Sequence, residues 1–277
     1  MSPELKRRII SGLVLAVAVL AATWYGGFSF RIVAAAIAVL IYYEWSTVTR
    51  LAERDFRANA FGWVAILLIA YNIVFGESDL AVPLLGGSAI TAVLLVLWRR
   101  GSWWLPGGIV YAGLSGISLA AIRGEDQAGF VATLFIFAVV WATDILAYFV
   151  GRALQGPKLA PRISPGKTWS GAIGGAVSGV IASSALTLAV FSRLSFWTVA
   201  IAFLLSVASQ VGDLFESFIK RRFGVKDSSH LIPGHGGVMD RVDGLVFACF
   251  AAFLLTLVYS ASTGHLDTSV AGFLFGF

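Results

Sequence analysis

Long apolar runs follow one another through most of this sequence, and they constrain the fold more than any other feature. Runs of 17 residues or more recur, and each is long enough for a helix to cross a hydrocarbon core about 30 Å thick. They do not alternate polar and apolar residues, as the strands of a membrane β-barrel would. Only 13% of the residues are charged. We therefore predict an all-α, polytopic integral membrane helical bundle.

About nine membrane-spanning helices are predicted, and eight or ten remain alternatives because the third and fifth runs are short or interrupted by glycine. The first run leads straight into a second, so we interpret it as a helix and not as a cleavable signal peptide. An N-terminal region, 1–125, holds about five spans, and a C-terminal region, 126–277, is predicted to carry the chemistry. The predicted spans are 9–25, 28–46, 60–75, 79–98, 105–122, 128–151, 170–192, 195–219 and 243–260.

The distribution of positive charge orients these spans. If the N-terminus is cytoplasmic and the chain alternates, 17 of the 20 Lys and Arg residues fall on the cytoplasmic side, as the positive-inside rule requires. The net charge of +5 is then explained by topology, and no nucleic-acid partner is predicted. Both long polar loops, 152–169 and 220–242, are expected to face the cytoplasm.

Three glycines in the seventh predicted span, Gly171, Gly175 and Gly179, form one smooth stripe. Such a stripe lets another helix approach closely. We favour packing within the chain, and a homodimer interface is the alternative.

Four carboxylates lie in the predicted spans or at their cytoplasmic ends: Asp144, Asp213, Asp240 and Asp243. A carboxylate inside a span costs about 3 kcal/mol on insertion scales, so Asp144 is expected to be functional, with a structural ion pair as the alternative. Asp240 and Asp243 stand one turn apart at the start of the last span, where hard oxygen ligands suit Mg²⁺ and where the helix dipole alone would favour one Asp. The single cysteine, Cys249, excludes a disulfide framework.

Cations accompany these carboxylates in both loops. Prolines and glycines keep 152–169 from forming a helix, and its cations suit phosphates or anionic headgroups, although positive-inside charge alone explains some of them. Glu216 and Lys220 are spaced as a helix-stabilising pair. The pattern as a whole indicates a metal-dependent site for phosphates at the membrane surface, with phosphoryl or nucleotidyl transfer to a lipid as the reaction class.

The segment 217–243 resembles the phosphatidate cytidylyltransferase (CDP-diacylglycerol synthase) family closely. Parts of the other polar loop, around Gly151-Arg152 and Lys167-Thr168-Trp169, are also similar to that family. The fixed positions of the family pattern are all met: Ser217, Lys220, Arg221, Lys226, Asp227, Ser229, Ile232, Pro233, His235, Gly236, Gly237, Asp240, Arg241 and Asp243.

The resemblance implies an Mg²⁺-dependent transfer of CMP from CTP to phosphatidic acid in a bacterial-type cytoplasmic membrane, with one or two metal ions. It implies metal ligands at Asp144, Asp213, Asp240 and Asp243. Catalytic roles are expected for Asp213, Asp240, Asp243 and Lys226. Substrate-binding roles are expected for Arg152, Lys158, Lys167, Ser217, Lys220, Arg221, His235 and Arg241.

Two other functions stay open from the sequence. One is a membrane phosphotransferase of the CDP-alcohol type, although its closely spaced Asp-Gly and Ala-Arg elements are absent here. The other is an ion-coupled transporter with acids in its spans. The acids of this chain cluster at the cytoplasmic ends of the spans, which argues against a transporter.

Overall fold

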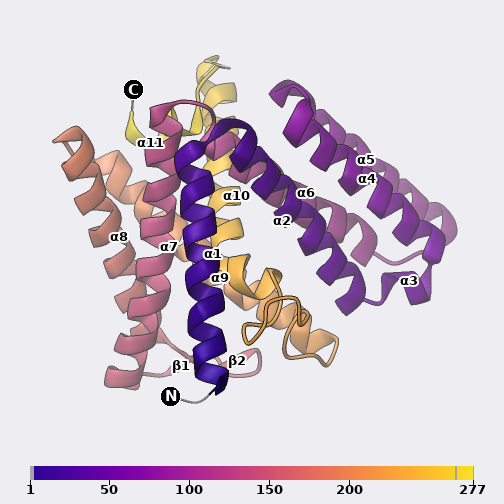
Figure 1. Cartoon of the computed structure of the whole chain (residues 1–277), viewed down its shortest axis with the longest axis horizontal. Helices are drawn as coiled ribbons and strands as arrows, with labels where there is room; N and C mark the ends of the chain where they lie inside the picture. The colour runs from indigo at the N-terminus through magenta and orange to yellow at the C-terminus, as the bar shows by residue number, and fades with distance from the viewer. Residues whose placement is uncertain (1–2, 266, 277) are drawn as a thin grey trace. The chain divides into compact units, whose positions relative to one another are not determined.

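The computed structural model describes residues 3–265 and 267–276, with side chains described from Ile10 onward. Helices dominate it (Figure 1) because hydrocarbon offers backbone N–H and C=O groups no partner, and a helix satisfies them within itself. In chain order the elements are α1 (Pro3–Tyr25), α2 (Gly27–Val48), α3 (Leu51–Arg54), α4 (Phe56–Phe75), α5 (Ser78–Arg99), α6 (Trp104–Arg123), α7 (Gln127–Leu154), β1 (Lys158–Ala160), β2 (Ser164–Thr168), α8 (Trp169–Phe191), α9 (Phe196–Arg222), α10 (Met239–Thr263) and α11 (Val270–Phe275).

Each of the nine predicted spans coincides with a long helix. Among the described residues, eight of these helices are long and apolar enough to cross a membrane, and α1 holds a shorter apolar segment, Ile10–Tyr25. The predicted polytopic, all-α membrane architecture is therefore confirmed, while the number of crossings and the cytoplasmic N-terminus stay predictions.

The chain divides into two compact units, which are described separately. The first comprises Met1–Ala121 and Arg222–Arg241, and the second comprises Ile122–Arg221 and Val242–Phe277. The loop that joins α9 to α10 thus folds with the N-terminal helices, although in sequence it lies far from them.

Aromatic side chains build the core of the first unit. The indole N–H of Trp45 in α2 donates to the backbone oxygen of Trp104 at 2.8 Å. Phe223, in the loop after α9, meets the ring of Trp104 at a centroid distance of 5.0 Å and lies under the guanidinium of Arg54. Three segments predicted to be cytoplasmic, those after α2, before α6 and after α9, therefore meet at one end of this unit.

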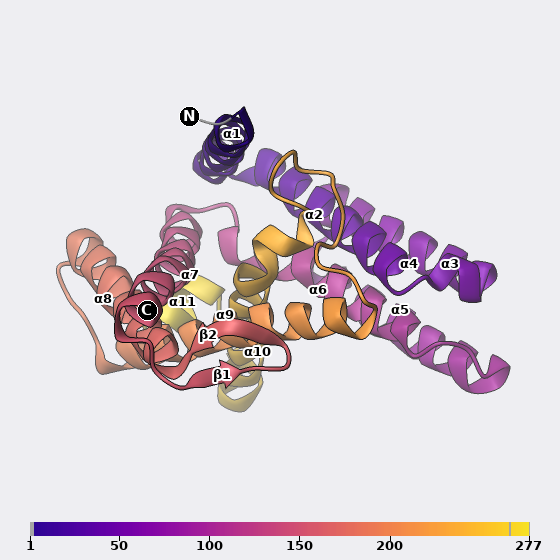
Figure 2. The same ribbon diagram turned by 90° about the horizontal axis from the view of Figure 1, so that it is seen from below.

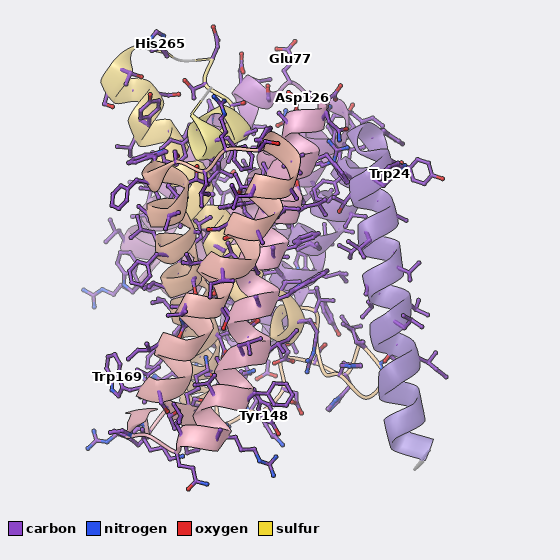
Figure 3. All side chains as sticks on the ribbon, turned by 90° about the vertical axis from the view of Figure 1, so that its left-hand side faces the viewer. Trp24, Glu77, Asp126, Tyr148, Trp169 and His265 are labelled. Atoms are coloured by element: carbon purple, nitrogen blue, oxygen red, sulfur yellow. The ribbon has the colours of Figure 1, made fainter. Side chains whose placement is uncertain are left out.

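In the second unit, α7 and α8 lie side by side (Figure 3), with Tyr148 and Trp169 at one end and Asp126 and His265 at the other. The helix starts are capped, since Asp126 accepts the Gly129 N–H at 2.7 Å and Thr168 accepts the Gly171 N–H at 3.1 Å. The strands β1 and β2 between these helices pair antiparallel. Of the predicted non-helical loop 152–169, residues 155–168 are non-helical, whereas α7 continues to Leu154 and α8 begins at Trp169.

The glycine stripe of α8 packs against α7. A Cβ built on Gly175 would lie 2.7 Å from the backbone oxygen of Thr143, and one on Gly171 would lie 2.7 Å from that of Ala147. Close packing within the chain, the interpretation we favoured for the stripe, is confirmed by these distances.

Replacing Gly175 by leucine should therefore lower stability by about 1–3 kcal/mol, since the side chain would overpack the α7–α8 contact. Gly87→Leu is the matched control, because Gly87 lies in α5 with no atom within 4 Å of a built Cβ. The melting temperature of the detergent-purified variants tests this. Equal melting of Gly175→Leu, Gly87→Leu and the unchanged protein would contradict it.

Candidate active site

The segment with the family pattern forms a compact loop in the first unit. Figure 2 shows the connection between α9 and α10 running beside α2. The backbone N–H of Ile232 donates to the oxygen of Gly236 at 2.9 Å, which closes a turn. Gly234 and Gly236 have φ values of 78° and 83°, in the left-handed region that glycine adopts at little cost. The glycines of this segment thus form a turn of defined conformation.

Asp240, in the first turn of α10, organises this loop. Its Oδ2 accepts hydrogen bonds at 2.8 Å from the backbone N–H and the hydroxyl of Ser228 and from the backbone N–H of Gly237. A Cβ on Gly236 would lie only 2.8 Å from the same oxygen. One of the predicted metal ligands therefore has an oxygen engaged in shaping the loop.

Glu44, which the sequence analysis overlooked, lies at the centre of the same loop. Its side chain comes from α2 and is fully buried. It accepts four hydrogen bonds, two from the loop hydroxyls of Ser228 and Ser229 and two from the backbone N–H groups of Val238 and Met239. Glu44 could have been found from the sequence, because it is a carboxylate inside a predicted span. The cost of such a carboxylate is the reason for which Asp144 was predicted to be functional.

His235 and Arg241 are joined through the backbone of the turn. The Nε of Arg241 donates to the backbone oxygen of His235 at 2.9 Å. The Nδ1 of His235 lies 2.8 Å from the hydroxyl of Ser11 in α1, which also donates to the backbone oxygen of Pro233. The start of α1 therefore lies at the same end of the first unit as the loop, as the predicted topology requires.

Lys226, also in this loop, has an exposed side chain. It stands between α9 and the turn, where a cation can meet a ligand from outside the chain.

A second group of predicted residues gathers in the second unit. Asp144 in α7 lies within electrostatic range of Asp213 in α9, Asp243 in α10 and Lys167 in β2. Lys167 pairs with Asp213 at 2.5 Å, with side chains 27% and 35% exposed. Three helices and the hairpin thus bring together carboxylates that are up to about a hundred residues apart in sequence.

The end of α9 adds polar groups to this cluster. Glu216 is buried, 2% exposed, and its Oε2 lies 2.8 Å from the ammonium of Lys220, so the predicted helix pair is confirmed. Ser217 donates to Asp213 at 3.4 Å. Asp243 accepts the backbone N–H of Gly244 at 2.8 Å. Asp213 thus has one partner on β2 and another one turn along its own helix.

The remaining predicted cations lie at the surface. Arg152 donates to the hydroxyl of Tyr148 one turn earlier in α7. Lys158 in β1 and Arg221 near the end of α9 have exposed side chains. The structure thus places Lys158 on the hairpin that carries Lys167, and Arg152 in the last turn of the helix that precedes it.

The carboxylates of the second unit are oxygen ligands of the kind that Mg²⁺ uses, although they do not form a closed cage. Within the described residues no three His, Cys, Asp or Glu side chains are grouped so as to hold a metal by themselves. Mg²⁺ is commonly held by one or two carboxylates together with water and substrate phosphates. Asp144, Asp213 and Asp243 supply carboxylates of that kind close to one another.

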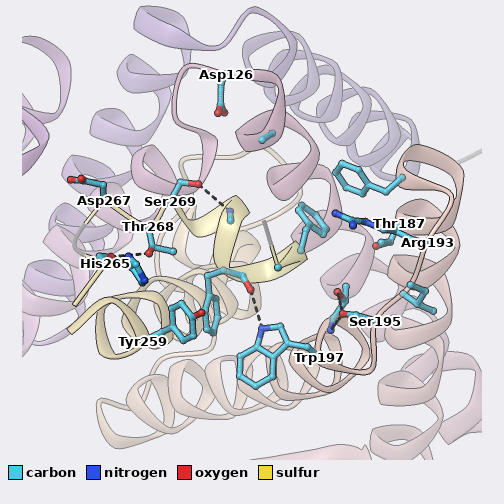
Figure 4. Close-up of a pocket in the computed structure, with 18 of the residues that line it drawn as sticks. Asp126, Thr187, Arg193, Ser195, Trp197, Tyr259, His265, Asp267, Thr268 and Ser269 are labelled. Carbon is cyan, nitrogen blue, oxygen red and sulfur yellow. Dashed lines mark hydrogen bonds between the residues drawn. The ribbon is translucent and has the colours of Figure 1, made fainter. Parts of the chain in front are cut away.

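A cavity of about 1310 Å³ lies elsewhere in the second unit. Figure 4 shows Arg193, Trp197 and His265 among its lining residues. Its wall also includes Asp126, the residue before α7 begins, so it lies at the opposite end of the unit from Tyr148 (Figure 3). None of the predicted site residues lines it.

Comparison with known proteins identifies the family to which this sequence is related. Residues 6–259 match the sequence profile of the cytidylyltransferase family. A phosphatidate cytidylyltransferase of Brucella abortus is 44% identical over 260 residues, which cover 93% of this chain and 95% of the relative. The phosphatidate cytidylyltransferases of Haemophilus influenzae and Bacillus subtilis are 33% and 30% identical, over 88% and 92% of this chain and 96% and 98% of theirs.

The two lysines of the second unit should differ in their contribution to folding. Lys220→Met should destabilise the protein by about 3 kcal/mol, because it removes the cation beside the buried Glu216. Lys167→Met should cost less than about 1 kcal/mol, because its pair with Asp213 is partly exposed. Melting of the two variants in one detergent measures the difference, and a larger loss for Lys167→Met would contradict the assignment.

Proposed function

Because the chain belongs to the cytidylyltransferase family, we propose that it is an integral membrane phosphatidate cytidylyltransferase. It transfers CMP from CTP to phosphatidic acid and yields CDP-diacylglycerol and pyrophosphate. The observation that carries this function is the near full-length similarity to relatives of that name. Its substrates are CTP and a membrane lipid, and its product feeds phospholipid synthesis.

The reaction needs no covalent enzyme intermediate. An oxygen of the lipid phosphate attacks the α-phosphorus of CTP, and a new O–P bond forms. The bond between the α-phosphorus and the oxygen that bridges to the β-phosphate breaks, and pyrophosphate leaves with the electron pair. A phosphomonoester is already ionised and nucleophilic at neutral pH, so the protein's main tasks are to align two anions and to offset their charge.

Asp144, Asp213 and Asp243 are the carboxylates that we propose would hold Mg²⁺ in the second unit. When bound, the metal neutralises charge on the triphosphate and on the attacking and leaving oxygens. Lys167 pairs with Asp213, and we propose that its ammonium also binds a phosphate oxygen of the substrate. Asp240, whose Oδ2 is bonded within the loop, is the fourth carboxylate proposed as a magnesium ligand.

We propose phosphate-binding roles for the predicted cations of each unit. Arg152, Lys158 and Lys167 lie on or beside the hairpin of the second unit. Lys226, His235 and Arg241 belong to the loop of the first unit, and Ser217, Lys220 and Arg221 lie at the end of α9. Charge-assisted hydrogen bonds from such groups are the strong ones for phosphate.

The active site is proposed to face the cytoplasm of a bacterial-type inner membrane. The excess of Lys and Arg in the segments expected there supports this side, as does the fact that CTP and free Mg²⁺ are cytoplasmic. Within the first unit, the start of α1 and the polar loop share one end, in agreement with the alternation on which this side was assigned.

The function is tested with purified protein, CTP labelled in its cytosine, phosphatidic acid and a titration of Mg²⁺. Label should enter a chloroform-soluble lipid only when phosphatidic acid and metal are both present, and EDTA should stop the transfer. Transfer at full rate in EDTA would overturn the metal requirement. No lipid product from wild-type protein with CTP or any other nucleoside triphosphate would overturn the function.

Asp243→Asn should lower kcat by about 100-fold or more, since a neutral amide is a poor magnesium ligand and the metal supplies several kcal/mol of charge stabilisation. The folded fraction should change little, because the backbone N–H of Gly244, one of the groups bonded to Asp243, can also donate to an amide oxygen. Asp79→Asn is the matched control at an exposed position in the first turn of α5. Near-normal turnover by a well-folded Asp243→Asn protein would remove Asp243 from the metal site.

A further inference from the structure

We propose that Glu44 is a positioning residue for this reaction: its buried carboxylate, on α2, holds the loop 228–239 and the start of α10 in the conformation that catalysis uses. The inference rests on the cytidylyltransferase activity proposed above. The loop carries residues of the family pattern, and Glu44 lies outside that pattern by more than 170 residues.

The hydrogen bonds of Glu44 divide evenly between its two oxygens. Oε1 accepts from the hydroxyl of Ser229 at 2.6 Å and from the backbone N–H of Val238 at 2.8 Å. Oε2 accepts from the hydroxyl of Ser228 at 3.0 Å and from the backbone N–H of Met239 at 2.6 Å. Hydrogen bonds to a charged acceptor are about twice as strong as neutral ones, which offsets the cost of burying the charge.

The carboxylate of Glu44 also lies at the N-terminal end of α10, where a helix favours a negative charge. Val238 and Met239 stand where α10 begins, and the first N–H groups of a helix lack partners inside the helix. A negative charge at that end is favoured by the helix dipole. Glu44 therefore fixes the start of α10 from another helix, one residue before Asp240.

Gly237 shows that the fit is close. A Cβ at this position would collide with the hydroxyl of Ser228 and would lie 2.5 Å from Oε1 of Glu44. Only a residue without a side chain lets the loop backbone come this near to the carboxylate. Glu44, Ser228 and Gly237 are thus one packed contact, and Asp240 bonds to two of the three.

Glu44→Gln tests the carboxylate with almost no change in volume. The amide can accept on one side only, and on either side its NH₂ group would face a backbone N–H, that of Val238 or that of Met239, so two donors would oppose each other. The matched control is Glu53→Gln, because Glu53 is an exposed glutamate of α3 in the same unit. We expect kcat to fall at least tenfold for Glu44→Gln and to stay unchanged for Glu53→Gln.

A second readout follows the loop itself and needs no activity. Leu231 is 46% exposed in the loop and the natural Cys249 is buried, so Leu231→Cys offers a thiol whose maleimide labelling rate reports loop order. Adding Glu44→Gln should raise that rate about tenfold at an unchanged melting temperature, whereas Glu53→Gln should not. Because labelling is independent of turnover, an inactive wild-type protein would count against the proposed function and leave this test intact.

Two outcomes would overturn the proposal. One is a folded Glu44→Gln protein with normal kcat and normal labelling. The other is a Glu44→Gln protein that melts earlier but keeps normal kcat per folded molecule, which would show a purely structural role. If Glu44→Gln does not fold, Ser229→Ala removes one of the four donors; it should fold, lower kcat several-fold and speed labelling, and a normal result would equally overturn the proposal.

Discussion

The cost of placing a charge in an apolar interior governs the polar chemistry of this protein. A carboxylate in hydrocarbon must find donors, a cation or water, and the buried carboxylates seen here do so. Glu44 is met by four donors, and Glu216 by Lys220. Since such partners exist only where helices end and loops return, the charges concentrate at the helix ends, where a soluble nucleotide can reach them.

Two kinds of polar centre result, one in each unit. In the first unit the carboxylates of Glu44 and Asp240 are occupied with backbone and hydroxyl donors, and they give the loop its shape. In the second unit Asp144, Asp213 and Asp243 lie near one another, with Lys167 beside them. Carboxylates within electrostatic range of one another repel, and a bound divalent cation would relieve that repulsion. The contacts of the first group show that it shapes the loop, and metal binding by the second group is our proposal.

Most of the architecture could be predicted from the sequence, because span length and apolarity are local properties. The pairing of Glu216 with Lys220 and the close packing of Gly175 were also predictable, since helical periodicity decides which residues share a face. The contact of Lys167 with Asp213 and the role of Glu44 were not. The partners of Glu44 lie 184 to 195 residues away, and no local pattern indicates which buried carboxylate a distant loop will meet.

The most direct measurement of the central claim compares CTP labelled at its α-phosphate with CTP labelled at its γ-phosphate in parallel reactions with phosphatidic acid. The account predicts that the α label moves into the chloroform-soluble lipid and that the γ label stays in water as pyrophosphate, in equal amounts. A γ label in the lipid would mean phosphate transfer instead of CMP transfer, and would contradict the account.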